Sequence, residues 1–497
     1  MARRGFLFNG YKISRESNRR SNSRVLASSA DGDKSDKKTA AVLHDATITP
    51  RDNRRGRGQA LRGIAPREDH AGWKPAADRP SPIDVLAKNS EGRIEELVPL
   101  RYGRMLPTPF TFFRGAAAVM AQDLALTTTT GVQVQACGDM HLLNFGAFAT
   151  PERNVAFDIN DFDETLPAPW EYDLQRLTVS FILAARENGL KPKHALNASN
   201  AVLASYREKM AEYSKMSILD IWYDRIDWRH VIESTSSPEV KKRREKALNK
   251  AMRRNSEFYF PKLVDSQADG FLIKDQPPRI YHPENGSGKP FREKISEALE
   301  AYKESLQEDK RRLFSRYRYV DSALKVVGIG SVGTMCAIAL LLAPDDEPLF
   351  LQIKEARPSV FEDFVGESSF ENRGQRVVEG QRIMQSASDI FLGWTKFDES
   401  KHFYVRQLRD TKIKLEPELW DAKIMLEMAK IMGSVLARAH ARSGDSAVIS
   451  GYLGSEPIFD EAMTDFAVAY ADQVEKDHAE LVKAHQSGKI EVKIETE

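Results

Sequence analysis

An aspartate and an asparagine lie five residues apart in a glycine-flanked segment, CGDMHLLNFG, at residues 137–146. Asp139 follows a strand-like segment, and a second strand-like segment ends at Asp161, two residues before Asp163. A carboxylate placed this way can accept the proton of an attacking hydroxyl, while an amide and a second acid hold magnesium on phosphate oxygens. We therefore expect Asp139 to be a base, Asn144 and Asp161 to hold metal, and Asp163 to assist a second ion.

A glycine-rich segment, VVGIGSVGT, forms a second candidate site much later in the chain. Its small residues are Gly328, Gly330, Ser331 and Gly333. The pattern after it predicts a strand, a turn at PDDEP and a further strand that ends near Lys354. Such a loop can cover phosphates and such a lysine can grip them. Glu379, in the next predicted helix, is the expected ion-pair partner of Lys354.

Other chemistries remain open for the same residues. The glycine spacing is also that of a dinucleotide fingerprint, with MCAIALLLA as its helix and Glu355 as its acid, which would indicate a Rossmann-type NAD(P)-binding protein. A metal hydrolase could use four ligands: His141, Asp139, Asp158 and Asp161. Arg114, at a predicted helix start, could bind a phosphate or form a structural ion pair.

The acidic segments resemble a known family. GDMHLLN resembles the GDxHxxN loop of the aminoglycoside phosphotransferase and choline kinase branch of the protein-kinase-like fold. VAFDINDFDET resembles the strand that ends in the metal motif of that branch, and PWEYDL resembles the start of its next helix. The chain from Arg101 to Gly451 also resembles an uncharacterised, largely bacterial family of unknown function grouped with this fold. Cys137 stands where the branch usually has a histidine, which is mainly a scaffold residue.

The order of the segments predicts a circular permutation. Read from Val326, the chain gives the glycine loop, the lysine strand, a helix, the hinge-like strand YVRQL and a helix ending LARAHARSG. That last helix resembles the one that precedes the catalytic loop in phosphotransferases, yet here the loop lies in the first half of the chain. HARSGD mimics a catalytic loop, but no metal acid follows Asp445, so we interpret it as a helix end. We expect Lys354 and Asp161 to face each other across one cleft, with His440 beside the strand entering Cys137.

The resemblance implies an α+β, bilobal, protein-kinase-like (aminoglycoside phosphotransferase-like) fold, circularly permuted, with a largely helical C-lobe. We expect four regions: a disordered basic N-terminal arm (1–85), a C-lobe with the catalytic and metal loops plus a helical insert (86–320), an N-lobe with the glycine loop and lysine strand (321–410), and helices returning to the C-lobe with a C-terminal tail (411–497). The insert, at residues 190–320, is expected to shape the acceptor pocket.

The composition limits the classes of partner that we expect for this protein. The 497 residues are 41% hydrophobic and 29% charged, and 73 Lys and Arg balance 72 Asp and Glu. A net charge of +1 gives no reason to expect nucleic acid or a membrane as partner, and the longest apolar run is too short to span a bilayer. The two cysteines indicate a reducing, cytoplasmic location, although the Arg-rich first residues could also form an organelle transit peptide.

The predicted function is an ATP- and Mg²⁺-dependent phosphotransferase that acts on a small-molecule or protein hydroxyl acceptor. A nucleotide-binding pseudokinase and a nucleotidyl (AMP) transferase on the same fold are the alternatives. The presence of the lysine, the metal acids and Asp139 argues against loss of activity.

Overall fold

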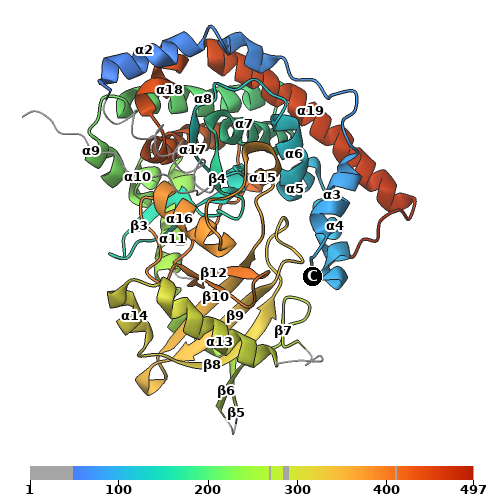
Figure 1. The fold of residues 1–497 in the computed structure, drawn as a ribbon, viewed down its shortest axis with the longest axis vertical. Coiled ribbons are helices and arrows are strands. Elements are labelled where there is room, and N and C mark those ends of the chain that lie inside the picture. The colour runs from blue at the N-terminus through green and yellow to red at the C-terminus, as the bar shows by residue number, and fades with distance from the viewer. Residues whose placement is uncertain (1–48, 268–269, 284–289, 409–410, 496–497) are drawn as a thin grey trace, which may run out of the picture. The chain divides into compact units, whose positions relative to one another are not determined.

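The computed structural model of the protein describes residues 49–267, 270–283, 290–408 and 411–495. Two units divide the chain, residues 1–49 and 50–497, and every element described below belongs to the second (Figure 1). Most of the expected N-terminal arm, together with the transit peptide, lies outside the described residues. The described chain is a mixture of helices and strands, as the α+β prediction requires.

One antiparallel sheet of six strands carries the glycine loop and Lys354. Its order is β11 (Gly393–Lys396), β12 (His402–Gln407), β10 (Pro348–Ala356), β9 (Cys336–Leu342), β8 (Arg318–Lys325) and β7 (Ile280–Tyr281). Alternate residues of β9 enter two different cores: Ala337, Ala339 and Leu341 pack with α13 (Phe291–Tyr302), whereas Ile338, Leu340 and Leu342 pack on the opposite face. A strand that is buried on both faces has no polar positions, which is why this segment also suited a helix in the sequence.

A larger helical region carries the acidic loops. Its central helices are α7 (Trp170–Glu187), α8 (Pro192–Tyr213), α17 (Ala422–Ser443), α18 (Ser446–Leu453) and α19 (Ile458–Gln486). Two small antiparallel sheets of two strands each accompany them: β1 (Gln133–Ala136) with β4 (Leu166–Pro169), and β2 (Phe145–Ala149) with β3 (Val155–Ile159). Within the described residues, no helix is long and apolar enough to cross a membrane.

Shorter elements complete the fold. On the N-terminal side they are α2 (Arg51–Leu61), α3 (Pro82–Ser90), α4 (Val98–Met105), α5 (Pro109–Gly115) and α6 (Ala117–Leu124). Between α8 and the sheet they are α9 (Ile218–Tyr223), α10 (Trp228–Glu233), α11 (Pro238–Met252), α12 (Ser256–Leu263), β5 (Val264–Gln267), β6 (Gly270–Ile273) and α14 (Glu308–Phe314). Two more, α15 (Glu362–Val365) and α16 (Arg373–Met384), follow β10.

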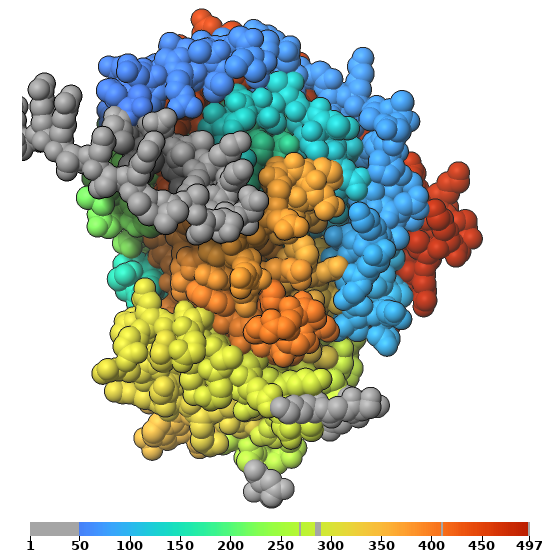
Figure 2. Space-filling view, viewed as in Figure 1, coloured from blue at the N-terminus to red at the C-terminus, as the bar shows by residue number. Residues whose placement is uncertain are grey.

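The prediction of a disordered arm is wrong for residues 51–85. Helix α2 packs on α18, and Gly58 allows the close approach, since a Cβ atom there would lie 2.0 Å from the Val448 carbonyl oxygen. Arg62 adds bonds to two carbonyl oxygens at the end of α18, those of Gly451 and Tyr452. Figure 2 shows this N-terminal segment in blue along the surface of the helical region. The segment has no apolar period, so no local pattern predicts its order. Packing on α18 and the hydrogen bonds of Arg62 order it instead.

The predicted boundary at residue 320 is also wrong. Residues from α12 onward already pack on the sheet, since Leu263 and Ile273 belong to the core on one face of β9. Before β8 the helical chain is interrupted after Tyr302, where α13 ends, and α14 begins at Glu308. There the Tyr302 hydroxyl donates to the Phe391 carbonyl and the Ser305 hydroxyl accepts from Trp394 N at 3.0 Å, so the break joins this segment to β11.

Candidate functional site

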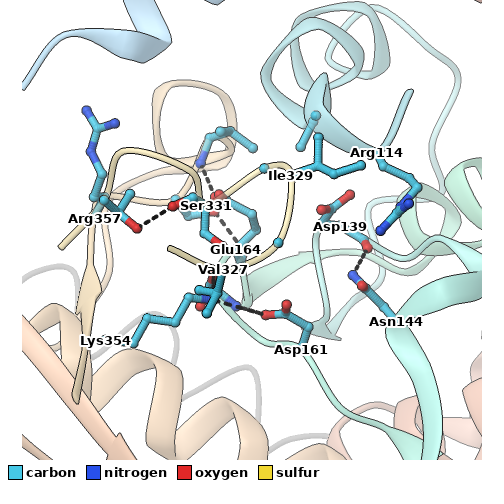
Figure 3. A pocket seen from close by; sticks show the side chains of 18 of the residues that line it. Arg114, Asp139, Asn144, Asp161, Glu164, Val327, Ile329, Ser331, Lys354 and Arg357 are labelled. Atoms are coloured by element: carbon cyan, nitrogen blue, oxygen red, sulfur yellow. Dashed lines mark hydrogen bonds and ion pairs between the residues drawn. The ribbon is translucent and has the colours of Figure 1, made fainter. Parts of the chain in front are cut away.

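A cavity of about 1470 Å³ is lined by both the sheet and the helical region. The loop between β8 and β9, the end of β10, and residues 406–408 and 412–415 contribute from the sheet side. The loops that follow β1 and β3 contribute the acidic side chains (Figure 3). This cavity collects Asp139, Asn144, Asp161, Asp163, Gly328, Gly330, Ser331 and Lys354, which the sequence singled out in two distant segments.

Lys354 meets the acidic loop directly. Its Nζ atom donates to Asp163 and lies 3.9 Å from Asp161 Oδ1, while the Tyr404 hydroxyl donates to the other oxygen of Asp163 at 2.8 Å. Burial alone would lower the pKa of Lys354, but the two carboxylates outweigh burial and raise that pKa well above its usual range. Lys354 is therefore charged, and the prediction that it faces Asp161 across one cleft is confirmed.

The partner of Lys354 differs from the predicted one. Glu379 forms its ion pair with Arg382, at 2.9 Å, and does not line the cavity. Helix α16 instead turns Arg376 towards the acidic loop, where it donates to the backbone oxygens of Asp163 and Thr165. The prediction for Glu379 is wrong because the sequence gives the helix but not the rotation of that helix about its axis.

Asp161 is the more accessible of the two acids near Lys354. Its side chain is 38% exposed, against 26% for Asp163. Burial would raise the pKa of Asp163, but Lys354 and Tyr404 hold that pKa below its usual value. Both oxygens of Asp163 already accept bonds, which leaves Asp161 as the carboxylate available to a cation.

Asp139 is half-buried and is bonded to an arginine. Arg176, from α7, donates to Asp139 Oδ1 through Nε at 2.6 Å and contacts the same oxygen through Nη2 at 2.5 Å. Asn144 Nδ2 donates to the Asp139 carbonyl at 2.5 Å, so the amide oxygen of Asn144 is the atom left for a cation. Burial raises the pKa of Asp139 to about 7, although Arg176 opposes that shift.

The loop that carries Asp139 is fixed from beneath by a second aspartate. Asp173, in α7, accepts from the backbone amides of Cys137 at 2.7 Å and Gly138 at 2.9 Å. His440, near the end of α17, contacts the same carboxylate at 3.1 Å through Nε2, and its Nδ1 bonds to the Tyr206 hydroxyl. The expected position of His440 beside the strand entering Cys137 is thereby confirmed.

Cys137 contributes to the scaffold rather than to chemistry. The thiol is buried, and burial raises its pKa well above the usual range, so it is neutral. Its Sγ atom donates to the Asp161 carbonyl at 3.1 Å, which links the two acidic loops. The adjacent Gly138 has φ +84°, and a Cβ there would lie 2.5 Å from the Glu164 carbonyl oxygen, so the turn requires glycine.

The glycine loop connects two antiparallel strands. Gly328 has φ +68° and Gly333 has φ +86°, conformations that favour glycine. The residues after Gly333 form β9 instead of the helix that a dinucleotide fingerprint needs, and the sheet is antiparallel. The Rossmann-type alternative is therefore wrong, whereas the predicted order of strand, glycine loop, strand, turn and lysine strand is confirmed.

The sequence of residues 93–484 matches that of a family described as an uncharacterized protein conserved in bacteria (DUF2252). The chain belongs to this family. The match contains every cavity residue named so far. Among curated proteins and among solved structures, nothing matches the chain.

Arg93, the first residue of the family match, stabilises the glycine loop by hydrogen bonds. Its guanidinium donates to the carbonyls of Gly330 at 2.9 Å and Val332 at 2.6 Å, and the next amide, of Ile94, donates to the Gly333 carbonyl. This explains why Gly333 itself does not line the cavity, since a Cβ there would lie 3.1 Å from Arg93. Nothing in the sequence near Arg93 identifies its partner.

The metal-hydrolase alternative is not compatible with the positions of its ligands. Asp158 is buried and accepts from Arg438 at 2.5 Å and from the Ser386 hydroxyl at 2.8 Å, outside the cavity. In the part of the chain that the structure describes, no group of three or more His, Cys, Asp and Glu side chains could hold a metal ion. That prediction is therefore wrong.

Several cavity residues were missed in the sequence, and one expected contributor is absent. The cavity wall includes four cations that were not predicted: Arg93, Arg101, Arg357 and Arg406. Arg176 bonds to Asp139 but is not part of the cavity lining. The helical insert at 190–320 contributes no lining residue among those described, and residues 85–122 take its place. Arg176 alone carried a usable signal in the sequence, because apolar residues surround it in a helical segment, WEYDLQRLTVSFILAAR, and a charge in an apolar helix requires a partner.

Proposed function

We propose that this protein is an ATP- and magnesium-dependent phosphotransferase with a protein-kinase-like arrangement, acting on a hydroxyl acceptor. The observation that carries the proposal is the meeting of Lys354 with Asp161 and Asp163 in the cavity that also contains Asp139 and the glycine loop. These groups come from segments far apart in the chain, and each has the chemistry that its place in phosphoryl transfer requires.

The residues fit a nucleotide. Gly328, Gly330 and Ser331 line the cavity from a loop with little side-chain bulk, so backbone can approach phosphate oxygens. Lys354 supplies a fixed positive charge beneath the loop. Ligand pockets commonly measure roughly 300–1,000 Å³, so a cavity of about 1470 Å³ has room for a nucleotide and an acceptor together.

The donor set also fits magnesium. Mg²⁺ prefers oxygen ligands and is commonly held by one or two carboxylates together with substrate phosphates. Asp161 offers an accessible carboxylate and Asn144 offers an amide oxygen, both in the cavity wall. When bound, magnesium-ATP supplies the phosphoryl group and a cation that neutralises its oxygens.

Asp139 then serves as the base. Arg176 holds Oδ1, so Oδ2 is the oxygen that takes the proton of the acceptor hydroxyl. A base works best when its pKa is near the working pH, and the pKa of about 7 suits a carboxylate that must accept a proton and release it again near neutrality.

The order of elements supports a circular permutation within this proposal. The end of α17 lies beside β1, because the Ser443 hydroxyl accepts from Gln135 N at 3.0 Å and His440 shares Asp173 with the loop after β1. A kinase-like chain would continue from this helix into the catalytic loop, whereas here the two are joined only through space. Cutting a chain between neighbouring surface ends is a tolerated rearrangement.

The test is incubation of the purified protein and Mg²⁺ with ATP labelled at the γ or the α phosphorus, in the presence of a broad panel of hydroxyl acceptors. Transfer of the γ label, absent in Asp139→Asn, supports the proposal. Transfer of the α label indicates a nucleotidyl transferase instead. Binding of ATP with no transfer above the Asp139→Asn background, for any acceptor, indicates a pseudokinase.

Lys354→Met provides the matched test of nucleotide binding. The rise in melting temperature caused by Mg-ATP should be lost, because the charge on the phosphates is removed. Because Lys354 is a buried partner of Asp163, the variant should also melt earlier, and Lys354→Met combined with Asp163→Asn separates the two effects by removing the unpaired acid. An Mg-ATP response that is unchanged in both variants would contradict the proposal.

A further inference from the structure

The cavity wall beyond Asp139 contains an arginine, Arg114, that has no ion-pair partner among the described residues. Arg114 lines the cavity, yet among the described residues its guanidinium makes no hydrogen bond and no ion pair, and its Nε atom is buried without a partner. The neighbouring acid, Asp139, is already bound by Arg176. Asp139 therefore forms its ion pair with Arg176, and Arg114 has no ion-pair partner among the described residues.

The ring of His141 adds a second unsatisfied group. His141 is only 5% exposed, lines the same cavity, and has a buried Nδ1 atom with no hydrogen-bond partner. Burial, with the charges of Arg114 and Arg176, holds the pKa of His141 well below its usual range, so the ring is neutral and can donate one hydrogen bond. Its Nε2 atom lies 3.9 Å from Asp139 Oδ2, which places the ring directly beside the proposed base.

A helix start completes this part of the wall. Ala117 and Ala118, the first residues of α6, line the cavity, and Ala116 before them provides no side-chain cap. The first amides of a helix have no partner within the helix and favour an anion. An arginine, a neutral imidazole and free helix amides are together the donor set of an oxyanion site.

Arg114 lies apart from Lys354, the lysine proposed to bind the phosphates (Figure 3). In the view of Figure 3, Asp161 and Asp139 lie between Lys354 and Arg114. The tip of the glycine loop ends above Arg114, since a Cβ on Gly330 would lie 3.3 Å from the Arg114 carbonyl oxygen. In this view (Figure 3) Arg114 therefore lies beyond Asp139 as seen from Lys354, on the side that we assign to the acceptor.

We propose that Arg114, His141 and the start of α6 bind an anionic group of the acceptor, so that the substrate class is small hydroxyl compounds bearing a carboxylate or a phosphate. This inference rests on the proposed phosphotransferase function, and it adds the charge of the acceptor to it. The anion satisfies donors that the protein leaves unpaired and holds the hydroxyl beside Asp139. An uncharged acceptor would leave those donors buried without partners, which costs binding free energy.

The experiment measures binding rather than turnover, with three probes that differ only in their charged group: glycerol, glycerate and glycerol 3-phosphate. The melting temperature is followed against probe concentration with Mg²⁺ and a non-hydrolysable ATP analogue at saturation, which keeps the probes out of the nucleotide phosphate positions. We expect one or both charged probes to stabilise the protein and glycerol not to do so. The glycerate and glycerol 3-phosphate arms distinguish a carboxylate site from a phosphate site.

Arg114→Gln tests the assignment to this wall. Because Arg114 has no hydrogen-bond or ion-pair partner among the described residues, the variant should fold and keep its response to Mg-ATP. It should bind the charged probes about tenfold more weakly or worse. Arg114→Lys should keep part of the affinity. Arg312→Gln, which removes an exposed arginine paired with Glu308, is the control and should bind the probes like the wild type.

Three results would overturn the inference: equal binding of glycerol and the charged probes, no binding of either charged probe, or equal responses in wild type and Arg114→Gln. Failure of the phosphotransferase proposal is visible separately, because it appears as a missing response to Mg-ATP or as a response that Lys354→Met does not change.

Discussion

The two loops that frame the cavity are held in different ways. The loop that carries Asp139 is held by buried side chains, with Asp173 beneath its amides, Arg176 on its carboxylate and His440 behind. The glycine loop is held through its carbonyl oxygens, by Arg93 and by Arg104, which donates to the Gly328 carbonyl at 2.6 Å. The first arrangement fixes charged atoms in the core. The second supports a backbone from the outside, so that the loop can adjust around a ligand.

This difference indicates that the two loops have different roles: the Asp139 loop carries out the chemistry, and the glycine loop covers the ligand. A base must be fixed to within a fraction of an ångström to be effective. A cover over phosphates must open and close as ligand enters and leaves. The following variants test the comparison, from the largest expected effect to the smallest.

Asp139→Asn should have the largest effect, because it removes the base and keeps the shape of the loop. Turnover should fall roughly 10²–10⁴-fold, while the melting-temperature response to Mg-ATP is retained. Single-turnover kinetics with γ-labelled ATP and an accepted substrate would measure the change. Equal rates in the variant and the wild type would place the chemistry outside the buried loop.

Asp173→Asn tests the support of that loop. Asp173 is fully buried and accepts hydrogen bonds from two backbone amides, so its replacement should lower the free energy of unfolding by about 3 kcal/mol. Chemical denaturation monitored by fluorescence gives this value. Asp472→Asn is the matched control, because Asp472 forms an exposed pair with Arg186 and should contribute less than about 1 kcal/mol. Similar losses in both variants would contradict the comparison.

The pH dependence of kcat/KM tests the setting of Asp139. Its raised pKa means that the carboxylate is protonated below about pH 7, so activity should fall as the pH drops through that value and be retained above it. Arg176 lowers this pKa, and Arg176→Gln should therefore shift the acid limb towards higher pH, by about one unit for a typical ion-pair partner. Arg176→Lys keeps the charge and should shift the limb less. An acid limb near pH 4 would show that Asp139 is not the titrating base.

Arg93→Ala should have the smallest effect of the series. Loss of the bonds to the Gly330 and Val332 carbonyls frees the glycine loop, so the affinity for Mg-ATP should fall about fivefold, which corresponds to about 1 kcal/mol. Turnover at saturating ATP should change little. Titration calorimetry and initial rates separate the two quantities. A loss of turnover as large as that of Asp139→Asn would mean that the glycine loop takes part in the chemistry.

Local patterns in the sequence were sufficient for the strands, the loops and the residue types of the site. The alternating segments before Cys137 and Asp161 are β1 and β3, the segment ending in Lys354 is β10, and the segment at 373–384 is α16. Each depends on neighbours within a few residues, and such signals survive in a single sequence. The likeness of the acidic motifs to a known family then predicted which distant segments would meet.

Only the tertiary structure decided which charges pair and which stay free. Lys354 and Asp163 are 191 residues apart in the chain. No local pattern could therefore show that the partner of Lys354 is Asp163 and not the expected Glu379. Arg176 takes Asp139, an acid that also lies near Arg114. Residues 51–85 order against helices almost four hundred residues later. The sequence by itself determined the elements and their chemistry, since these depend on adjacent residues. Partner choice came from packing, because a buried charge binds whichever opposite charge the fold brings within reach.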